Sequence, residues 1–182
     1  MVGNVHRTAH YTIGDAHVSF ANAGTHILTV TENGAVIKTF PMSSGKDEFP
    51  TMSGKHLVLG KSQKVVMDSR TNGIPLGSPD GYLEDVFWDT QISSTGEYVH
   101  AAPWSVNSQG RRNVSHGCIN ISNANAEWFF NWSQRGDVVE VTGTSRPPNN
   151  DIAMIDWKVG YDEWRLGSAL FNPLPPPQAR IG

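Results

Sequence analysis

The feature that most constrains the fold is an Asn33-Gly34 pair between two runs of strand-forming residues, within residues 25–40. Asn and Gly adopt the positive φ angles that a two-residue β-hairpin turn requires. The flanking segments, ILTVTE and AVIKTF, carry the Val, Ile and Thr side chains that are enriched in strands. The sequence therefore predicts an antiparallel hairpin.

Further short runs of apolar or β-branched residues recur along the chain, each flanked by Gly, Ser, Asp or Pro. The chain of 182 residues holds 18 Gly and 11 Pro, and only 17% of its residues are charged, which favours turns and strands over long charged helices. Several short strands of this kind are typical of a sandwich or a barrel, so we predict a mainly β fold. The runs are 56–59, 65–67, 86–88, 98–101 and 138–141.

One segment has the pattern of a helix. Ser122 is a candidate N-cap, Trp128, Phe129 and Trp132 follow at helical spacing, and Gly136 stands where a helix would stop. We interpret the aromatic stripe as core packing rather than as a platform for bases or sugars. The sequence thus predicts one principal α-helix.

Two segments lack a regular pattern. Residues 68–85 interleave Gly with Pro and predict a long exposed loop, which is either an inert surface insertion or a lid over a site. After residue 145 the chain is Trp-rich, and we expect its apolar side chains to dock on the body as a strand or short helix. Residues 172–182 are Pro-rich and predict a flexible tail. The docking side chains would be Ile155, Trp157, Tyr161, Trp164 and Leu166.

The charge and the single cysteine exclude several classes of function. A net charge of -3, from 14 basic and 17 acidic residues, gives no electrostatic case for a nucleic-acid or anionic-membrane partner. No run approaches the roughly 18 apolar residues of a membrane helix. One cysteine cannot form an internal disulfide. The length suits one domain with a small appendage.

The chemistry is concentrated in Ser115-His-Gly-Cys-Ile-Asn120, which contains the only thiol. If this segment is extended, His116, Cys118 and Asn120 share one face. Gly117 removes a side chain beside the thiol and lets backbone amides be presented to a substrate as an oxyanion hole. A thiol nucleophile needs a base, and His100 is a candidate.

Two other interpretations of these residues remain. A lone cysteine is commonly a small buried apolar residue. A zinc site would need the C-x₂₋₄-C or H-x₃₋₅-H spacing, which is lacking here, so we predict no metal. The other histidines are dispersed and are interpreted as ordinary surface or core residues. They are His6, His10, His17, His26 and His56.

These residues resemble the L,D-transpeptidases of the YkuD type, and within that family the mycobacterial and other actinobacterial members. The family pattern is a His, a spacer of fourteen to seventeen residues, and then [Ser/Thr]-His-Gly-Cys-x-Asn. Here His100 is followed by fourteen residues and SHGCIN. The resemblance extends to the Asn33-Gly34 hairpin, the 41–45 turn, the 67–82 loop, residues 100–104 and the Trp-rich C-terminal part.

The resemblance implies a YkuD-like β-sandwich that acts on the peptide stems of peptidoglycan. Cys118 would attack the bond between diaminopimelate and the terminal D-Ala, form a thioester and expel D-Ala. The side-chain amine of a second stem would resolve the thioester and give a 3→3 cross-link. Carbapenems would acylate the same sulfur, and no cofactor is implied.

The resemblance also assigns roles to individual residues. His100 would be the base, oriented by the backbone carbonyl of Ala101. His116 would support the thiolate and, with the Gly117 and Cys118 amides, the tetrahedral oxyanion. Met67 and Tyr82 would contribute to the donor pocket, and Trp104 would line its wall. Ser115 would lie near the substrate, and Asn120 would hold the loop.

The implied organisation has three parts. Residues 1–145 would be the catalytic domain with 68–85 as its lid, residues 146–171 an extension packed on it, and residues 172–182 the tail. Larger relatives carry an export signal and an immunoglobulin-like domain, so we expect this chain to be part of a longer, exported protein. It would work in the cell envelope outside the cytoplasmic membrane, with a monomer as the default state.

Two alternatives to the transpeptidase remain. An L,D-carboxypeptidase or thiol peptidase would form the same acyl-enzyme and resolve it with water. A non-catalytic cell-wall-binding module would keep the fold without activity. The intact SHGCIN motif with His100 in place argues against the binding module.

Overall fold

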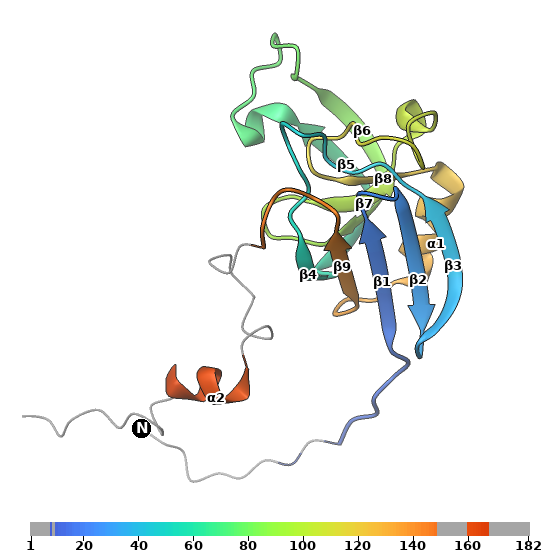
Figure 1. Ribbon diagram of the computed structural model, residues 1–182, viewed down its shortest axis with the longest axis vertical. Coiled ribbons are helices and arrows are strands. Elements are labelled where there is room, and N and C mark those ends of the chain that lie inside the picture. Colours follow the sequence, from blue (N-terminus) through green and yellow to red (C-terminus); the bar gives the residue numbers. More distant parts are fainter. Residues whose placement is uncertain (1–7, 9, 149–159, 168–182) are drawn as a thin grey trace, which may run out of the picture.

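The computed structural model of the chain describes residues 8, 10–148 and 160–167 (Figure 1). Within them, nine strands form two sheets, and the longest helix is α1 (Asn123–Trp132). The strands are β1 (His17–Asn22), β2 (Ile27–Glu32), β3 (Ala35–Pro41), β4 (Gly54–Leu57), β5 (Gly60–Asp68), β6 (Leu83–Gln91), β7 (Tyr98–Ala101), β8 (Ile119–Ile121) and β9 (Val138–Thr142).

The first sheet has the order β3-β2-β1-β9-β4. The predicted hairpin is confirmed: β2 and β3 pair antiparallel, and Asn33 and Gly34 have φ angles of 51° and 83°. The two positive angles are those of a turn whose twist matches that of the strands. β1, which the sequence analysis did not predict, pairs antiparallel with β2 and parallel with β9.

The second sheet, in the order β5-β6-β7-β8, carries the chemical motif. β7 and β8 are parallel neighbours, and their register sets His100 opposite Asn120. This pairing brings the histidine strand beside the segment that contains the cysteine. The two parts of the sequence motif are therefore joined by backbone hydrogen bonds of the sheet.

The core lies between the sheets and includes one face of α1. Ser122 caps the helix by accepting a hydrogen bond of 3.4 Å from the Asn125 amide. Trp128 and Trp132 stack at 5.6 Å between ring centroids and pack against the core, which confirms the core interpretation of the aromatic stripe. The helix ends at Trp132, earlier than Gly136. The largest buried core side chains include Phe40, Phe129, Leu28, Met42, Ile92, Ile119 and Ile121.

The 68–85 segment joins β5 to β6 and projects at one end of the molecule (Figure 1). Most of the segment is exposed, but it also holds a short regular element that the sequence analysis did not predict. It begins with a short 3-10 helix, η1 (Ser69–Asn72), which Asp68 caps by accepting a hydrogen bond from the Arg70 amide. Gly73, with φ 75°, ends that helix, because a left-handed residue breaks the turn.

The extension after residue 145 is described only in part. Residues 160–167 contain α2 (Tyr161–Trp164) and η4 (Arg165–Gly167). Tyr161 and Trp164 are exposed, and their rings stack at 6.2 Å. Ile155, Trp157 and the predicted tail lie outside the described residues, so docking of the extension stays a prediction. No helix in the described ranges is long and apolar enough to cross a membrane.

Asp89 of β6 carries a pH-dependent cost in stability. Its side chain is fully buried, neither carboxylate oxygen has a hydrogen-bond partner, and burial raises its pKa to about 7. The folded state therefore holds a proton that the unfolded chain releases above pH 4. Stability falls as the pH rises through this interval, and the loss is complete above the folded pKa.

We expect Asp89→Asn to raise the melting temperature at pH 8 much more than at pH 5. The gain at pH 8 should correspond to roughly 2–4 kcal/mol, because the variant has no carboxyl to ionise. Scanning calorimetry at both pH values measures it. Asp85→Asn is the control, because Asp85 lies on the same strand but is exposed beside Lys64. Its melting temperature should change little at either pH. Equal gains for Asp89→Asn at both pH values would contradict the assignment.

Candidate active site

A cavity of about 940 Å³ opens between the predicted lid (residues 68–85), the start of β7 and the segment before β8. This volume is within the range of sites that enclose a small ligand or the end of a peptide. Ala101 and Gly117 are not among the lining residues. The predicted site residues that line it are Met67, Tyr82, His100, Trp104, Ser115, His116, Cys118 and Asn120.

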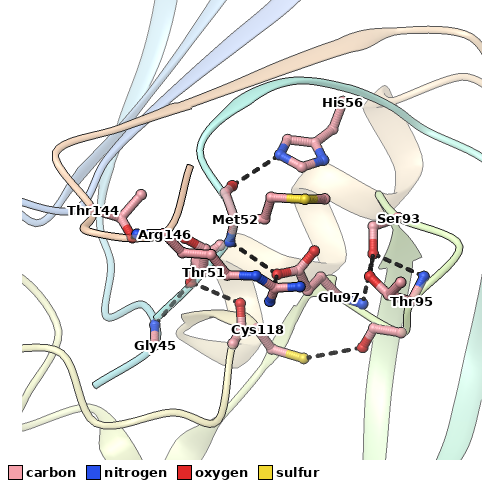
Figure 2. Close-up of polar contacts among 12 residues, drawn as sticks. Gly45, Thr51, Met52, His56, Ser93, Thr95, Glu97, Cys118, Thr144 and Arg146 are labelled. Atoms are coloured by element: carbon pink, nitrogen blue, oxygen red, sulfur yellow. Dashed lines mark hydrogen bonds and ion pairs between the residues drawn. The ribbon is translucent and has the colours of Figure 1, made fainter. Parts of the chain in front are cut away.

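Cys118 is partly exposed in this cavity. Its Sγ lies 3.8 Å from the carbonyl oxygen of Gly96 (Figure 2), and the Tyr98 backbone amide donates to it. Desolvation raises the pKa of the thiol to about 12, with smaller contributions from the Glu97 and Asp89 carboxylates, while the Tyr98 amide opposes the shift. The sulfur is therefore a neutral thiol at neutral pH.

His100 lines the same cavity from β7 and is only 3% exposed. Its Nδ1 lies 2.9 Å from the carbonyl oxygen of Ala101. Because a carbonyl only accepts, Nδ1 carries the proton and Nε2 keeps its lone pair. Burial lowers the pKa of the ring to about 4, against opposing hydrogen bonds to Ala101 and Asn120. At neutral pH the ring is thus neutral, in the tautomer of a base.

A tight turn presents Cys118 to the cavity. The Ser115 hydroxyl donates to the Cys118 carbonyl at 2.6 Å and accepts from the Gly117 amide at 3.1 Å. Gly117 has φ 130°, a left-handed value that side chains rarely adopt. The chain bends at Gly117, so it is extended only from Ile119, where β8 begins. His116, Cys118 and Asn120 nevertheless all line the cavity.

This turn also bears on the amides that were predicted to be oxyanion donors. The Gly117 amide is engaged by Ser115, so it is not a free donor to the cavity in this structure. Ser115 shapes the turn through its hydroxyl rather than only lining the substrate space. The Asn120 backbone bridges Ser43, and its side chain donates to Ser105 Oγ at 3.2 Å.

Thr51 holds the turn through a hydrogen bond to Gly117, a contact that the sequence analysis did not predict. Its fully buried hydroxyl donates to the Gly117 carbonyl at 2.7 Å and accepts from the Gly45 amide at 2.9 Å (Figure 2). Thr51 is 66 residues from Gly117 in the chain. No local pattern marks a threonine for such a contact.

His116 faces the lid. Its ring lies between Phe49, at 4.7 Å, and Tyr82, at 4.9 Å, and its Nε2 is 3.5 Å from Asp80 Oδ1. Asp80 also pairs with Lys46, which joins the lid to the loop after β3. Burial and Lys46 lower the pKa of His116, and Asp80 opposes them. His116, whose predicted role is beside the thiolate, thus also contacts Asp80 of the predicted lid.

Glu97 is a second residue that the sequence analysis missed. It precedes β7 and is 5% exposed. Its Oε1 accepts from the Met52 amide at 2.9 Å and from Arg146 Nη1 at 3.1 Å (Figure 2). Its Oε2 is buried without a hydrogen-bond partner. Both Glu97 and Arg146 line the cavity.

The described part of the chain contains no group of three or more His, Cys, Asp or Glu side chains placed to hold a metal ion. A thiol and an imidazole line one cavity in a two-sheet β protein with one principal helix. Fold and cavity together define the class as a β-sheet protein with a cysteine-histidine site.

Comparison with known proteins identifies the family. The model of the YkuD L,D-transpeptidase catalytic domain matches residues 16–141, and the chain belongs to this family of acyltransferases. L,D-transpeptidase 2 of Mycobacterium tuberculosis is 47% identical over 171 residues, covering 93% of this chain and 42% of that protein. L,D-transpeptidase 1 of the same species is 49% identical over 142 residues, covering 78% and 57%.

Solved structures agree with this assignment. The structure of LD transpeptidase LdtMt1 in complex with imipenem matches with a TM-score of 0.70 and 50% identity, covering 71% of this chain and 60% of that one. An L,D-transpeptidase from Mycobacterium smegmatis matches with a TM-score of 0.70 and 46% identity, covering 71% and 59%. The chain spans about 40 to 60% of the length of the relatives named here.

Proposed function

We propose that this chain catalyses L,D-transpeptidation of peptidoglycan stems, with Cys118 as nucleophile and His100 as base. The observation that carries the proposal is that both side chains line one cavity, with the tautomer of His100 set by Ala101. Family membership supports the reaction class. The imipenem complex of a relative at 50% identity supports a β-lactam as a covalent partner of this chain also.

In the first half-reaction, Cys118 Sγ attacks the carbonyl carbon of the diaminopimelate that precedes the terminal D-Ala. The thiol proton passes to His100 Nε2 as the C–S bond forms, because the resting pair is neutral on both sides. The C–N bond then breaks, and D-Ala leaves as an amine that takes the proton from His100. A thioester remains on the enzyme.

The oxyanion formed in this step needs donors on the cavity wall. Of the two motif amides, that of Gly117 is occupied by Ser115, so we assign the Cys118 amide as the oxyanion donor. Met67 and Tyr82 bound the donor space on the lid side, and Trp104, whose ring is 6.1 Å from that of His100, forms the wall.

In the second half-reaction, the side-chain amine of another stem attacks the thioester carbon. The C–S bond breaks, the sulfur regains a proton through His100, and the new amide is a 3→3 cross-link. Water in place of the amine would give the carboxypeptidase alternative. Since the substrate is cell-wall material, we place the protein in the cell envelope outside the cytoplasmic membrane.

Intact mass spectrometry tests this function. The protein is incubated with a carbapenem and, separately, with a disaccharide tetrapeptide that ends in D-Ala. We expect a carbapenem adduct on the peptide containing Cys118, release of D-Ala, and a 3→3 dimer. Hydrolysed stem without dimer would favour the carboxypeptidase. No adduct and no D-Ala release would overturn the proposal.

A further inference from the structure

The cavity contains an ion pair between Glu97 and Arg146 that the mechanism above does not use. Glu97 has a side chain that is only 6% exposed, yet its Oε2 has no hydrogen-bond partner. A buried carboxylate oxygen without a donor costs free energy, so native structures seldom retain one without a role. A bound donor group would remove that cost.

Glu97 flanks the nucleophile directly. A Cβ at Gly117 would lie 3.7 Å from Glu97 Cγ and 3.8 Å from its Oε1, so the carboxylate side chain packs against the residue before Cys118. The carbonyl oxygen of Gly96, the residue before Glu97, lies 3.8 Å from Cys118 Sγ. A group bound at Glu97 would therefore lie beside the cysteine turn.

Arg146 completes the pair from the segment that follows β9. Its Nη1 donates to Glu97 Oε1, while its side chain is 39% exposed and lines the same cavity. A guanidinium group has five N–H donors, so one hydrogen bond to Glu97 leaves other N–H groups of Arg146 able to bind a carboxylate. The pair thus offers an acceptor for a cation and donors for an anion side by side.

An acceptor for a cation beside donors for an anion would suit the side chain of diaminopimelate in an acceptor stem. The side-chain carbon of diaminopimelate that bears the attacking amine also bears a carboxylate. In the first half-reaction a carboxylate near Cys118 is unfavourable, because it opposes ionisation of the thiol. In the second half-reaction the sulfur is a neutral thioester and the incoming group is a cation, so the same carboxylate becomes favourable.

We infer that Glu97 and Arg146 form the acceptor subsite: the Glu97 carboxylate binds the ammonium group of the acceptor and takes one proton from it, and Arg146 binds the carboxylate on the same carbon. The neutral amine then attacks the thioester, its second proton reaches the sulfur through His100, and Glu97 releases its proton to water when the product leaves. The donor stem occupies the lid side, bounded by Met67 and Tyr82. This inference rests on the proposed function, because it concerns how the thioester on Cys118 is resolved.

The test uses three acceptor stems with one tetrapeptide donor. The first acceptor has intact diaminopimelate, the second has its side-chain carboxylate converted to a carboxamide, and the third has lysine, which lacks that carboxylate. With Glu97→Gln, we expect kcat/KM for all three acceptors to fall about 10- to 100-fold. With Arg146→Gln, we expect a fall of about 10-fold for the intact acceptor and little change for the lysine stem.

Acylation is measured in parallel on the same proteins. Both variants should still form the carbapenem adduct and release D-Ala at rates within a few-fold of the unmodified chain. Glu127→Gln, an exposed carboxylate-to-amide change on α1 outside the cavity, is the matched control and should alter neither half-reaction. Thermal unfolding checks that each variant is folded.

The outcomes separate this inference from the proposed function. Absence of acylation in the unmodified protein would overturn both. Normal acylation with unchanged acceptor kinetics in Glu97→Gln would overturn only the acceptor subsite. If Glu97→Gln does not fold, the unmodified protein still decides: it should prefer the intact acceptor over the lysine stem by about 10-fold, and equal use of the two would overturn the inference.

Discussion

Cys118→Ala is expected to abolish both D-Ala release and cross-linking, with a loss of about 10⁴-fold or more. Removing the nucleophile removes the thioester route altogether, and the other cavity residues cannot replace it. The melting temperature should change little, because the thiol is partly exposed and its contact to Gly96 is a weak one of 3.8 Å. Rates are measured by D-Ala release and by muropeptide chromatography.

Cys118→Ser distinguishes a nucleophile from a packing residue. It keeps the size of the side chain, but a hydroxyl is far harder to ionise than a thiol, so activity should remain lost. Retained cross-linking in Cys118→Ala, together with a large drop in melting temperature, would mean that the sulfur serves only the packing of the turn.

His100→Gln is expected to slow acylation by about 10²- to 10⁴-fold, the usual effect of removing a general base. Gln can still donate to the Ala101 carbonyl, so the local structure should persist. Single-turnover formation of the carbapenem adduct measures the rate. His17→Gln is the matched control: His17 is stacked on Trp132 and does not line the cavity, so its loss should leave acylation unchanged.

The same histidine sets the pH dependence of the rate. With His100 titrating at about 4 and Cys118 at about 12, the neutral pair persists across the neutral range. We therefore expect kcat/KM for acylation to be flat from about pH 5 into the alkaline range and to fall only in acid. An inflection near pH 6.5 would show a solvated imidazole and contradict this account.

Stability gives an independent measure of the same pKa. In the unfolded chain His100 binds a proton below about pH 6.5, whereas in the folded state its pKa is lowered to about 4, so it binds that proton only below about pH 4. Stability is therefore lost as the pH falls through this interval, by about 3 kcal/mol. His100→Gln lacks this loss. Denaturant unfolding measures the free energy of unfolding of both proteins at pH 4.5 and pH 7. An equal loss of stability in the two proteins between these pH values would contradict a buried neutral His100.

Local patterns predicted much of the fold. The Asn33-Gly34 turn, the helix that Ser122 caps and the position of β7 follow from φ preferences, capping and side-chain periodicity, which act over a few neighbouring residues. β1 was missed because its buried side chains are the small Ser19 and Ala21, while its largest apolar side chain, Phe20, is exposed. The sequence left the conformation of residues 116–120 open, because a glycine permits the left-handed φ that Gly117 adopts but does not require it.

The candidate site divides in the same way. By itself, the sequence determined which residues can do chemistry here: one thiol, a histidine at a bounded spacing, and a glycine beside the sulfur. The tertiary structure alone decided that Thr51 holds the Gly117 carbonyl and that Glu97 keeps an unpartnered oxygen beside Cys118. The physical reason is that these contacts join residues tens of positions apart, and burial, which sets the protonation of His100 and Cys118, exists only once the sheets have packed.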